Sequence, residues 1–88
     1  MRKDTLYYAV LSYCCDKGTP VSAVDLHQDL PFRGRRDFTE KNLEQILMTA
    51  ANNGILTESC AELCADKLVV KYMADDEQKK VIEQYLAD

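Results

Sequence analysis

The first 52 residues contain three stretches in which apolar side chains recur every three or four positions, the period of an amphipathic α-helix. The first stretch predicts a helix that is capped by Asp4 and stopped by Gly18. Its apolar positions are Leu6, Tyr7, Val10, Leu11 and Cys14. Because each such stretch must bury its apolar side against another element, the spacing predicts a small helical core.

The second and third stretches carry helix-start signals of their own. Ser22 followed by Asp25 predicts a capping box, and Pro31 ends that short helix. The third helix begins at Asp37 or Thr39 and ends at the pair Asn53-Gly54. The expected apolar positions are Val24, Leu26 and Leu30 in the second helix, and Leu43, Ile46, Leu47 and Ala50 in the third. Helical spacing then puts Lys41, Gln45, Met48 and Asn52 on the outward face of the third helix.

Two later runs, Ile55–Ser59 and Leu68–Met73, have the composition of β-strands. We expect them to form an antiparallel hairpin with a connector over residues 60–67. A helix through the connector stays open, because no Gly or Asn marks a tight turn there. The residues that fit helical spacing are Cys60, Leu63, Cys64 and Leu68.

A last helix is predicted over about residues 76–87, because Asp75 with Gln78 three residues later forms another capping pair. Its expected apolar face consists of Val81, Ile82, Tyr85 and Leu86. The sequence thus predicts a mainly α fold with a small β-hairpin, in a single domain over residues 1–88. Hydrophobic residues make up 47% of the chain and charged residues 30%, as in globular domains.

Charge and hydropathy exclude some kinds of partner. Fifteen acidic and eleven basic residues leave a formal net charge of −4, so no overall basic field attracts phosphate or anionic lipid. The longest uncharged run, Thr5 to Cys15, has eleven residues, whereas a membrane-spanning helix needs about 20. Asp4 also interrupts the basic start that a secretory signal would require. We therefore expect a cytoplasmic chain with no membrane partner.

The residues that usually carry chemistry do not form a recognisable site. In a reducing compartment Cys14, Cys15, Cys60 and Cys64 are expected to be free thiols, and their spacing is a weak match to zinc ligands. His27 is the only histidine and is expected at the surface. The three glycines are isolated, so no phosphate-binding loop is present. We expect no metal, no cofactor and no enzymatic activity.

Three helices with a sharp break between the second and the third, followed by a hairpin, resemble the winged helix-turn-helix domains. The resemblance is architectural and covers about residues 4–73, with a C-terminal helix at about 76–87. It depends on the segments Val21–Leu26 and Leu43–Leu56. In that family the third helix enters the DNA major groove and the wing touches the backbone. The resemblance implies that Lys41, Gln45 and Asn52 reach toward bases, and that Arg33, Arg35 and Arg36 hold phosphates.

Acidic residues set a condition on this interpretation. Glu40 and Glu44 share the third helix with the base-reaching candidates, and the hairpin holds Glu58, Glu62 and Asp66. These carboxylates must point away from DNA if the domain binds it. The alternatives are an ordinary solvated helix face for Lys41, Gln45 and Asn52, and, for the arginines, an acidic protein partner or neutralisation by Asp29, Asp37 or Glu40.

The first helix also predicts an assembly, because its second side is uncharged. A symmetric homodimer would bury that side, with Tyr8, Ser12, Cys15, Tyr85 and Leu86 as candidate interface residues. The sequence therefore favours a small DNA-binding transcriptional regulator of winged-helix type. The alternative is an adaptor of winged-helix-like fold that binds another protein through the apolar surface of its first or last helix, which the acidic balance favours. Both functions are non-enzymatic.

Overall fold

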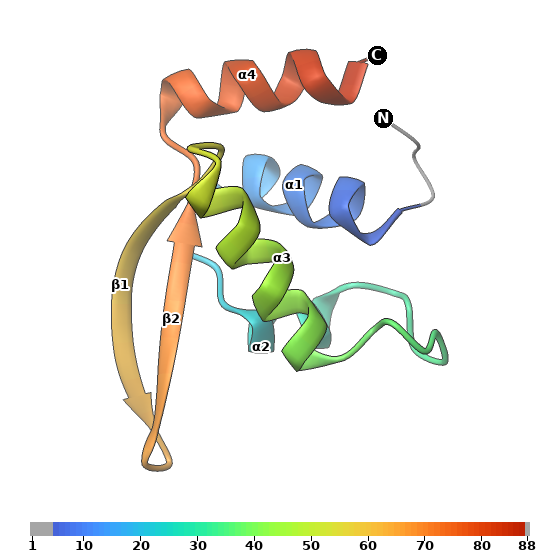
Figure 1. Cartoon of the computed structure of the whole chain (residues 1–88), viewed down its shortest axis with the longest axis vertical. Helices are drawn as coiled ribbons and strands as arrows, with labels where there is room; N and C mark the ends of the chain where they lie inside the picture. Colours follow the sequence, from blue (N-terminus) through green and yellow to red (C-terminus); the bar gives the residue numbers. More distant parts are fainter. Residues whose placement is uncertain (1–4, 88) are drawn as a thin grey trace.

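A computed structural model of the chain describes residues 5–87, which form four helices and one antiparallel two-stranded sheet (Figure 1). The helices are α1 (Leu6–Lys17), α2 (Ala23–Asp29), α3 (Glu40–Asn52) and α4 (Asp76–Ala87), and the strands are β1 (Thr57–Cys64) and β2 (Lys67–Met73). The predicted mainly α fold with a small hairpin is therefore confirmed. None of the helices within residues 5–87 has the length and apolarity needed to span a membrane.

Local capping explains where the first three helices start and stop. The Thr5 hydroxyl accepts a hydrogen bond from the Tyr8 amide at 3.2 Å, and Gly18 ends α1 in the left-handed conformation at φ 67°. The cap predicted at Asp4 lies outside the described residues. The capping box of α2 forms as predicted, with both the Ser22 and the Asp25 side chains bonded to backbone amides. At α3 the cap is Thr39, the second of the two candidates.

The hairpin differs from the prediction in its turn. Strand β1 continues to Cys64, so the expected connector over residues 60–67 shrinks to a two-residue turn at Ala65 and Asp66. Both turn residues have positive φ, 51° and 64°. Two left-handed residues match the twist of the paired strands, but here they are not the Gly or Asn that signals such a turn in a sequence. The hairpin prediction is confirmed and the length of its connector is wrong.

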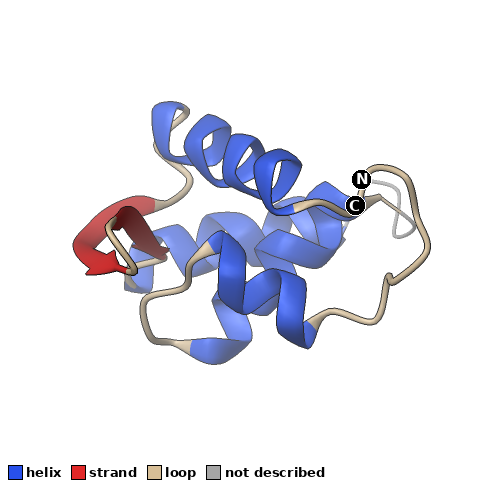
Figure 2. Ribbon diagram, turned by 90° about the horizontal axis from the view of Figure 1, so that it is seen from below, coloured by secondary structure: helices blue, strands red, loops and turns tan. Residues whose placement is uncertain are grey.

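One residue outside the hairpin pairs with it. Val21, between α1 and α2, exchanges two backbone hydrogen bonds with Tyr72 of β2, at 2.7 and 2.8 Å. This bridge lies on the edge of β2 that faces away from β1. It ties the base of the hairpin to the helices, while Figure 2, viewed from the side of the hairpin turn, shows the strands standing beside the helices rather than covering them.

Helix α4 closes the core by packing against α1 (Figure 1). Asp75 and Gln78 cap it reciprocally, with bonds of 2.7 and 3.0 Å. Of its four predicted apolar residues, Ile82 is fully buried and Leu86 is half-buried. Val81 and Tyr85 are 54% and 50% exposed, which corrects the prediction, because only one side of α4 meets α1.

The hydrophobic core lies among the helices and the base of the hairpin. Leu11, Leu26, Leu43, Leu47 and Ile82 are fully enclosed in it, so every helix contributes at least one such side chain. Within the apolar positions predicted for α2 and α3, Val24 is 38% exposed, and Leu30 and Ile46 are half-buried at the margin of the core. Val24 is therefore a second correction, because it lies at the surface near Lys67 to Val69 of β2 rather than in the core.

Candidate functional site

The outward face of α3 is where the sequence places it. Lys41, Gln45, Met48 and Asn52 are all exposed, while Leu43, Leu47 and Ala50 are buried. Thr39 fixes the register of the helix by its cap, and the buried stripe fixes its rotation about its own axis. The amide-bearing side chains are thus available for a contact.

A groove of about 650 Å³ runs between α2, the start of α3 and the outer part of β2. Its lining residues are Ala23 and Val24 of α2, Glu40, Lys41, Glu44 and Gln45 of α3, and Lys67, Leu68 and Val69 of β2. Asn52 does not line this groove, because it follows Gln45 by about 10 Å along the helix axis at 1.5 Å per residue. The groove therefore gathers two of the three base-reaching candidates.

The groove also holds the acidic residues that the DNA interpretation requires elsewhere. Glu40 and Glu44 line it beside Lys41 and Gln45. Glu44 is half-buried and accepts a hydrogen bond of 3.4 Å from the hydroxyl of Tyr72 on β2. Burial, with the nearby Glu44 and Glu58 carboxylates, raises the pKa of Tyr72 to about 12, so this hydroxyl stays a donor. DNA binding through Lys41 and Gln45 would require the acidic residues of α3 to lie elsewhere, but Glu40 and Glu44 line the same groove.

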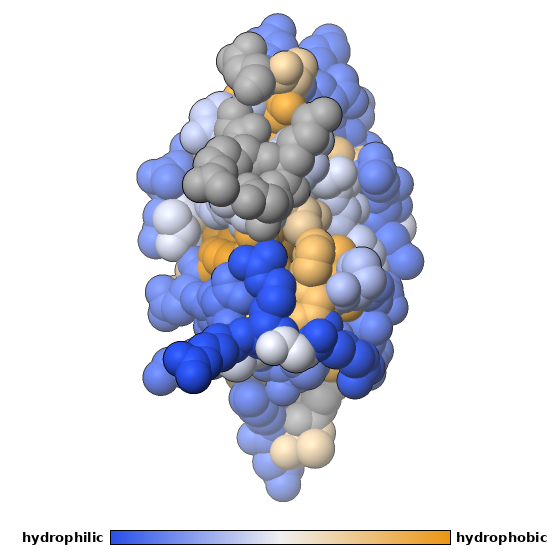
Figure 3. All heavy atoms as spheres, turned by 90° about the vertical axis from the view of Figure 1, so that its right-hand side faces the viewer, coloured by the Kyte–Doolittle hydropathy of each residue, from blue (hydrophilic) through white to orange (hydrophobic). Residues whose placement is uncertain are grey.

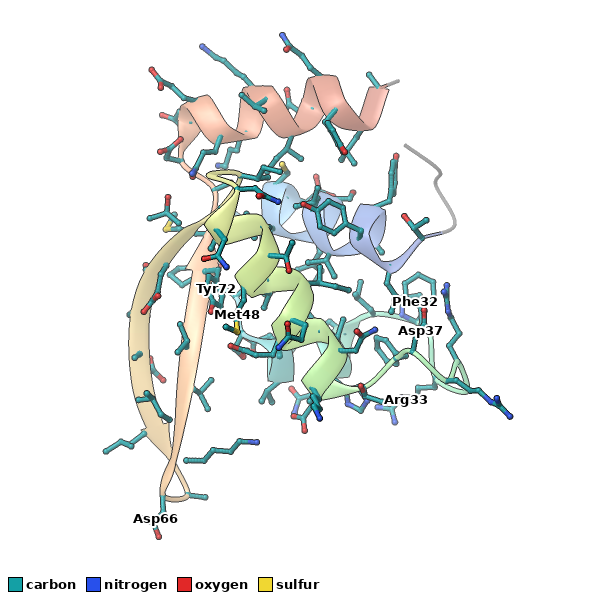
Figure 4. All side chains as sticks on the ribbon, in the orientation of Figure 1. Phe32, Arg33, Asp37, Met48, Asp66 and Tyr72 are labelled. Carbon is teal, nitrogen blue, oxygen red and sulfur yellow. The ribbon has the colours of Figure 1, made fainter. Side chains whose placement is uncertain are left out.

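The arginine loop, which carries Arg33, Arg35 and Arg36 between α2 and α3, lies on the opposite side of α3 from the hairpin. The labels for Arg33, Asp37 and Asp66 in Figure 4 show this arrangement. Arg35 forms two 2.9 Å hydrogen bonds with Asp37, through Nε and Nη2, and lies 5.5 Å from the ring centre of Phe32. The Arg35 hydrogen bond holds the pKa of the Asp37 carboxyl below its usual range. Neutralisation within the chain thus occurs for Arg35, and its partner is Asp37 rather than Asp29 or Glu40.

Arg33 and Arg36 are exposed, and neither forms an ion pair within residues 5–87. Figure 3 faces this side of the molecule and shows the strongly hydrophilic loop lying next to an apolar surface. None of the three arginines lines the groove that Lys41 and Gln45 line. An Asp29 carboxylate oxygen is already occupied, because it accepts a hydrogen bond from the Tyr13 hydroxyl.

Aromatic packing under this loop was missed by the sequence analysis. The His27 ring stacks on Phe38 with 4.8 Å between ring centres, and Phe32 meets Phe38 edge-on at 5.9 Å. His27 is therefore half-buried instead of a plain surface residue. Phe38 anchors the end of the loop, which places Thr39 to cap α3.

The candidate dimer residues fall into two groups. Cys15 and Leu86 are half-buried and pack against the core of their own chain. Tyr8 and Ser12 are half-buried at a shallow depression next to Leu30, and Tyr85 is exposed. The homodimer stays a prediction, and a monomer in sedimentation at micromolar concentration would contradict it.

The three cysteines whose side chains the structure describes, Cys14, Cys15 and Cys60, are free thiols. Cys14 of α1 is buried in the core, and this burial raises the pKa of its thiol to about 12, so the thiol is protonated. In the part of the chain that the structure describes, no three His, Cys, Asp or Glu residues are placed to hold a metal ion together.

The apolar part of the groove is a second feature that the sequence did not predict. Val24 and Leu68 were assigned to a helix core and a strand, and both lie at the groove, Leu68 with 61% of its surface exposed. The uninterrupted apolar run Leu68–Val70 next to Lys67 was the available signal, because a strand with one solvated face alternates apolar and polar residues.

None of the family models, curated proteins or solved structures compared with this chain matches it.

Proposed function

We propose that this chain is a winged-helix-like domain that binds another protein, and that the groove between α2, α3 and β2 is its binding site. The order of the elements supports the winged-helix assignment: α1, the bridging Val21, α2, α3 and then the hairpin. In such an arrangement the hairpin stands beside the third helix, as β2 stands beside α3 here.

The position of Glu40 and Glu44 in the groove is the observation that favours a protein partner over DNA. A phosphate brought to about 4 Å from a carboxylate costs about 4 kcal/mol at an effective dielectric constant near 20. One good bidentate base contact contributes about 1 to 3 kcal/mol. A contact by Lys41 or Gln45 in this groove would therefore be cancelled by its neighbours.

Exposed apolar side chains supply the attractive part of the proposed contact. Val24 and Leu68 line the groove from its two walls, and Met48 is exposed one turn beyond Glu44 on α3. Burying such residues favours association at any ionic strength, whereas counterion release makes DNA binding fall steeply as salt is added. The two functions are therefore distinguishable by their dependence on salt.

The test is capture of binding partners from nuclease-treated extract of the native cell by immobilised wild-type chain and by two hairpin variants. Leu68→Lys puts a charge into the groove. Leu63→Lys is the matched control, because Leu63 pairs with Leu68 across the hairpin, is 78% exposed and does not line the groove. We expect the same partner with wild type and with Leu63→Lys, and its loss with Leu68→Lys.

A fluorescence anisotropy titration with duplex DNA tests the competing function. We expect weak binding at low salt that Lys41→Ala and Gln45→Ala leave unchanged. Tight binding that both variants abolish and that weakens steeply between about 50 and 200 mM salt would refute the proposal.

A further inference from the structure

We propose that the partner enters this groove as an extended segment, which adds a strand to the open edge of β2 and places a basic residue against Glu40 and Glu44. This inference rests on the proposed function and specifies the chemistry of the partner. It follows from the hydrogen-bonding pattern of β2, the shape of the groove and the charges along it.

Strand β2 has one edge with unused backbone groups. Tyr72 exchanges its backbone hydrogen bonds with Val21, on the edge away from β1. Because neighbouring residues of an antiparallel strand point to opposite edges, Val70 and Leu68 present their N–H and C=O groups to the same edge as Tyr72. Val69 faces β1 instead, where it pairs with Glu62.

Nothing within the described chain continues the pairing that Val21 starts. After Val21 the chain turns into the capping box and α2, so the edge beyond Tyr72 has no further backbone partner. Unpaired edges of this kind accept an added strand in many peptide complexes.

The groove opens on this edge. Three consecutive residues of β2, Lys67 to Val69, line it, and β1 contributes none. Consecutive residues point to opposite faces of a strand, so only its edge brings all three to one groove. A volume of about 650 Å³ lies within the range of about 300 to 1,000 Å³ that is usual for ligand sites.

The walls of the groove specify the side chains of the segment. Leu68 shares a strand face with the buried Tyr72 and lies across the groove from Val24, so apolar residues fit at the ends of the segment. Glu40 and Glu44 form no ion pair within residues 5–87. A basic residue between the apolar ones would meet them, because the lining residues Lys41 and Lys67 are exposed and their long side chains can keep the ammonium groups in solvent.

The probe is a peptide of about seven residues with the sequence Thr-Val-Thr-Arg-Thr-Val-Thr. Its N-terminus is acetylated and its C-terminus is amidated. Added to the full chain, it should shift the amide resonances of Leu68 and Val70 and slow their hydrogen exchange. The Val69 amide is the internal control, because it is already paired with β1 and its protection should stay unchanged.

Two matched peptides separate backbone pairing from side-chain contact. Methylating the peptide nitrogens that face β2 removes the added ladder but keeps every side chain, and should weaken binding at least tenfold. Replacing the arginine by glutamate keeps the ladder and reverses the charge, and should also weaken binding at least tenfold.

A variant pair makes the same distinction in the chain. Leu68→Pro removes the N–H that faces the groove, while the pairing with β1 does not use that group. Leu68→Ala truncates the same side chain and keeps the N–H, so it should bind the peptide at least tenfold more tightly than Leu68→Pro does. If Leu68→Pro loses the hairpin resonances, the methylated peptide decides.

The inference is overturned if the peptide leaves the Leu68 and Val70 amides unperturbed at millimolar concentration, or if methylation has no effect. It is also overturned if those amides become protected on concentrating the chain alone, because the edge then pairs with a second copy. In each case, loss of the captured partner with Leu68→Lys but not with Leu63→Lys would leave the proposed function standing.

Discussion

Helix α4 offers a direct test of the packing, because two adjacent apolar residues have opposite environments. Ile82 is fully buried, whereas Val81 is 54% exposed. Ile82→Ala removes three carbon atoms, which at about 0.8 kcal/mol each gives about 2.4 kcal/mol before the cavity is counted. With the cavity we expect about 3 to 4 kcal/mol, within the usual range of about 2 to 5 for such substitutions.

That loss is large for a chain of 88 residues, whose whole stability should be about 4 to 13 kcal/mol at roughly 0.05 to 0.15 kcal/mol per residue. Urea unfolding followed by far-ultraviolet circular dichroism measures it. Val81→Ala is the control and should change the free energy of unfolding by less than about 0.5 kcal/mol. Equal losses for the two variants would refute the assignment of Ile82 to the buried side of α4.

Three further predictions concern the turn, one ion pair and the thiols. Ala65→Gly should stabilise the chain by about 0.5 kcal/mol, or a Tm rise of about 2 to 4 °C in calorimetry, because relief of about 1 to 2 kcal/mol of left-handed strain at this alanine exceeds the entropic cost of glycine, about 0.5 to 1 kcal/mol. In a carbon-13 titration the Asp37 carboxyl should have a pKa below 3.8, and Arg35→Gln should return it toward that value. The pair's contribution to stability is therefore present above pH 3.8 and lost as the pH falls through the lowered pKa, and a pKa unchanged by the substitution would count against the pair. A thiol reagent at pH 8, with peptide mapping, should modify the exposed Cys60 at once and Cys14 only when the chain unfolds, and equal rates would contradict the burial of Cys14.

The prediction of α3 succeeded because the signals that define it are local. Thr39 caps the helix by a bond to the amide of Asn42, three residues away, and the stripe of Leu43, Leu47 and Ala50 sets which side is buried. These interactions need no knowledge of the rest of the chain. The same holds for Ser22 with Asp25 in α2.

The turn of the hairpin shows where local signals mislead. Ala65 adopts positive φ although alanine does not normally mark this conformation, whereas Asp66 belongs to a type that tolerates it. The cost of about 1 to 2 kcal/mol at Ala65 is outweighed by the ladder of seven paired positions that the turn closes. Long-range pairing decided the turn, and no window of sequence contains that information.

The sequence alone determined the four helices, the caps of α2 and α4 and the outward face of α3, because each depends on residues three or four positions apart. Only the tertiary structure decided that Glu40 and Glu44 share a groove with the open edge of β2, and that Ile82 rather than Val81 is buried. Those facts depend on where the hairpin stands and on which side of α4 is covered. Both are set by contacts between residues far apart in the chain, and such contacts leave no periodic pattern to read.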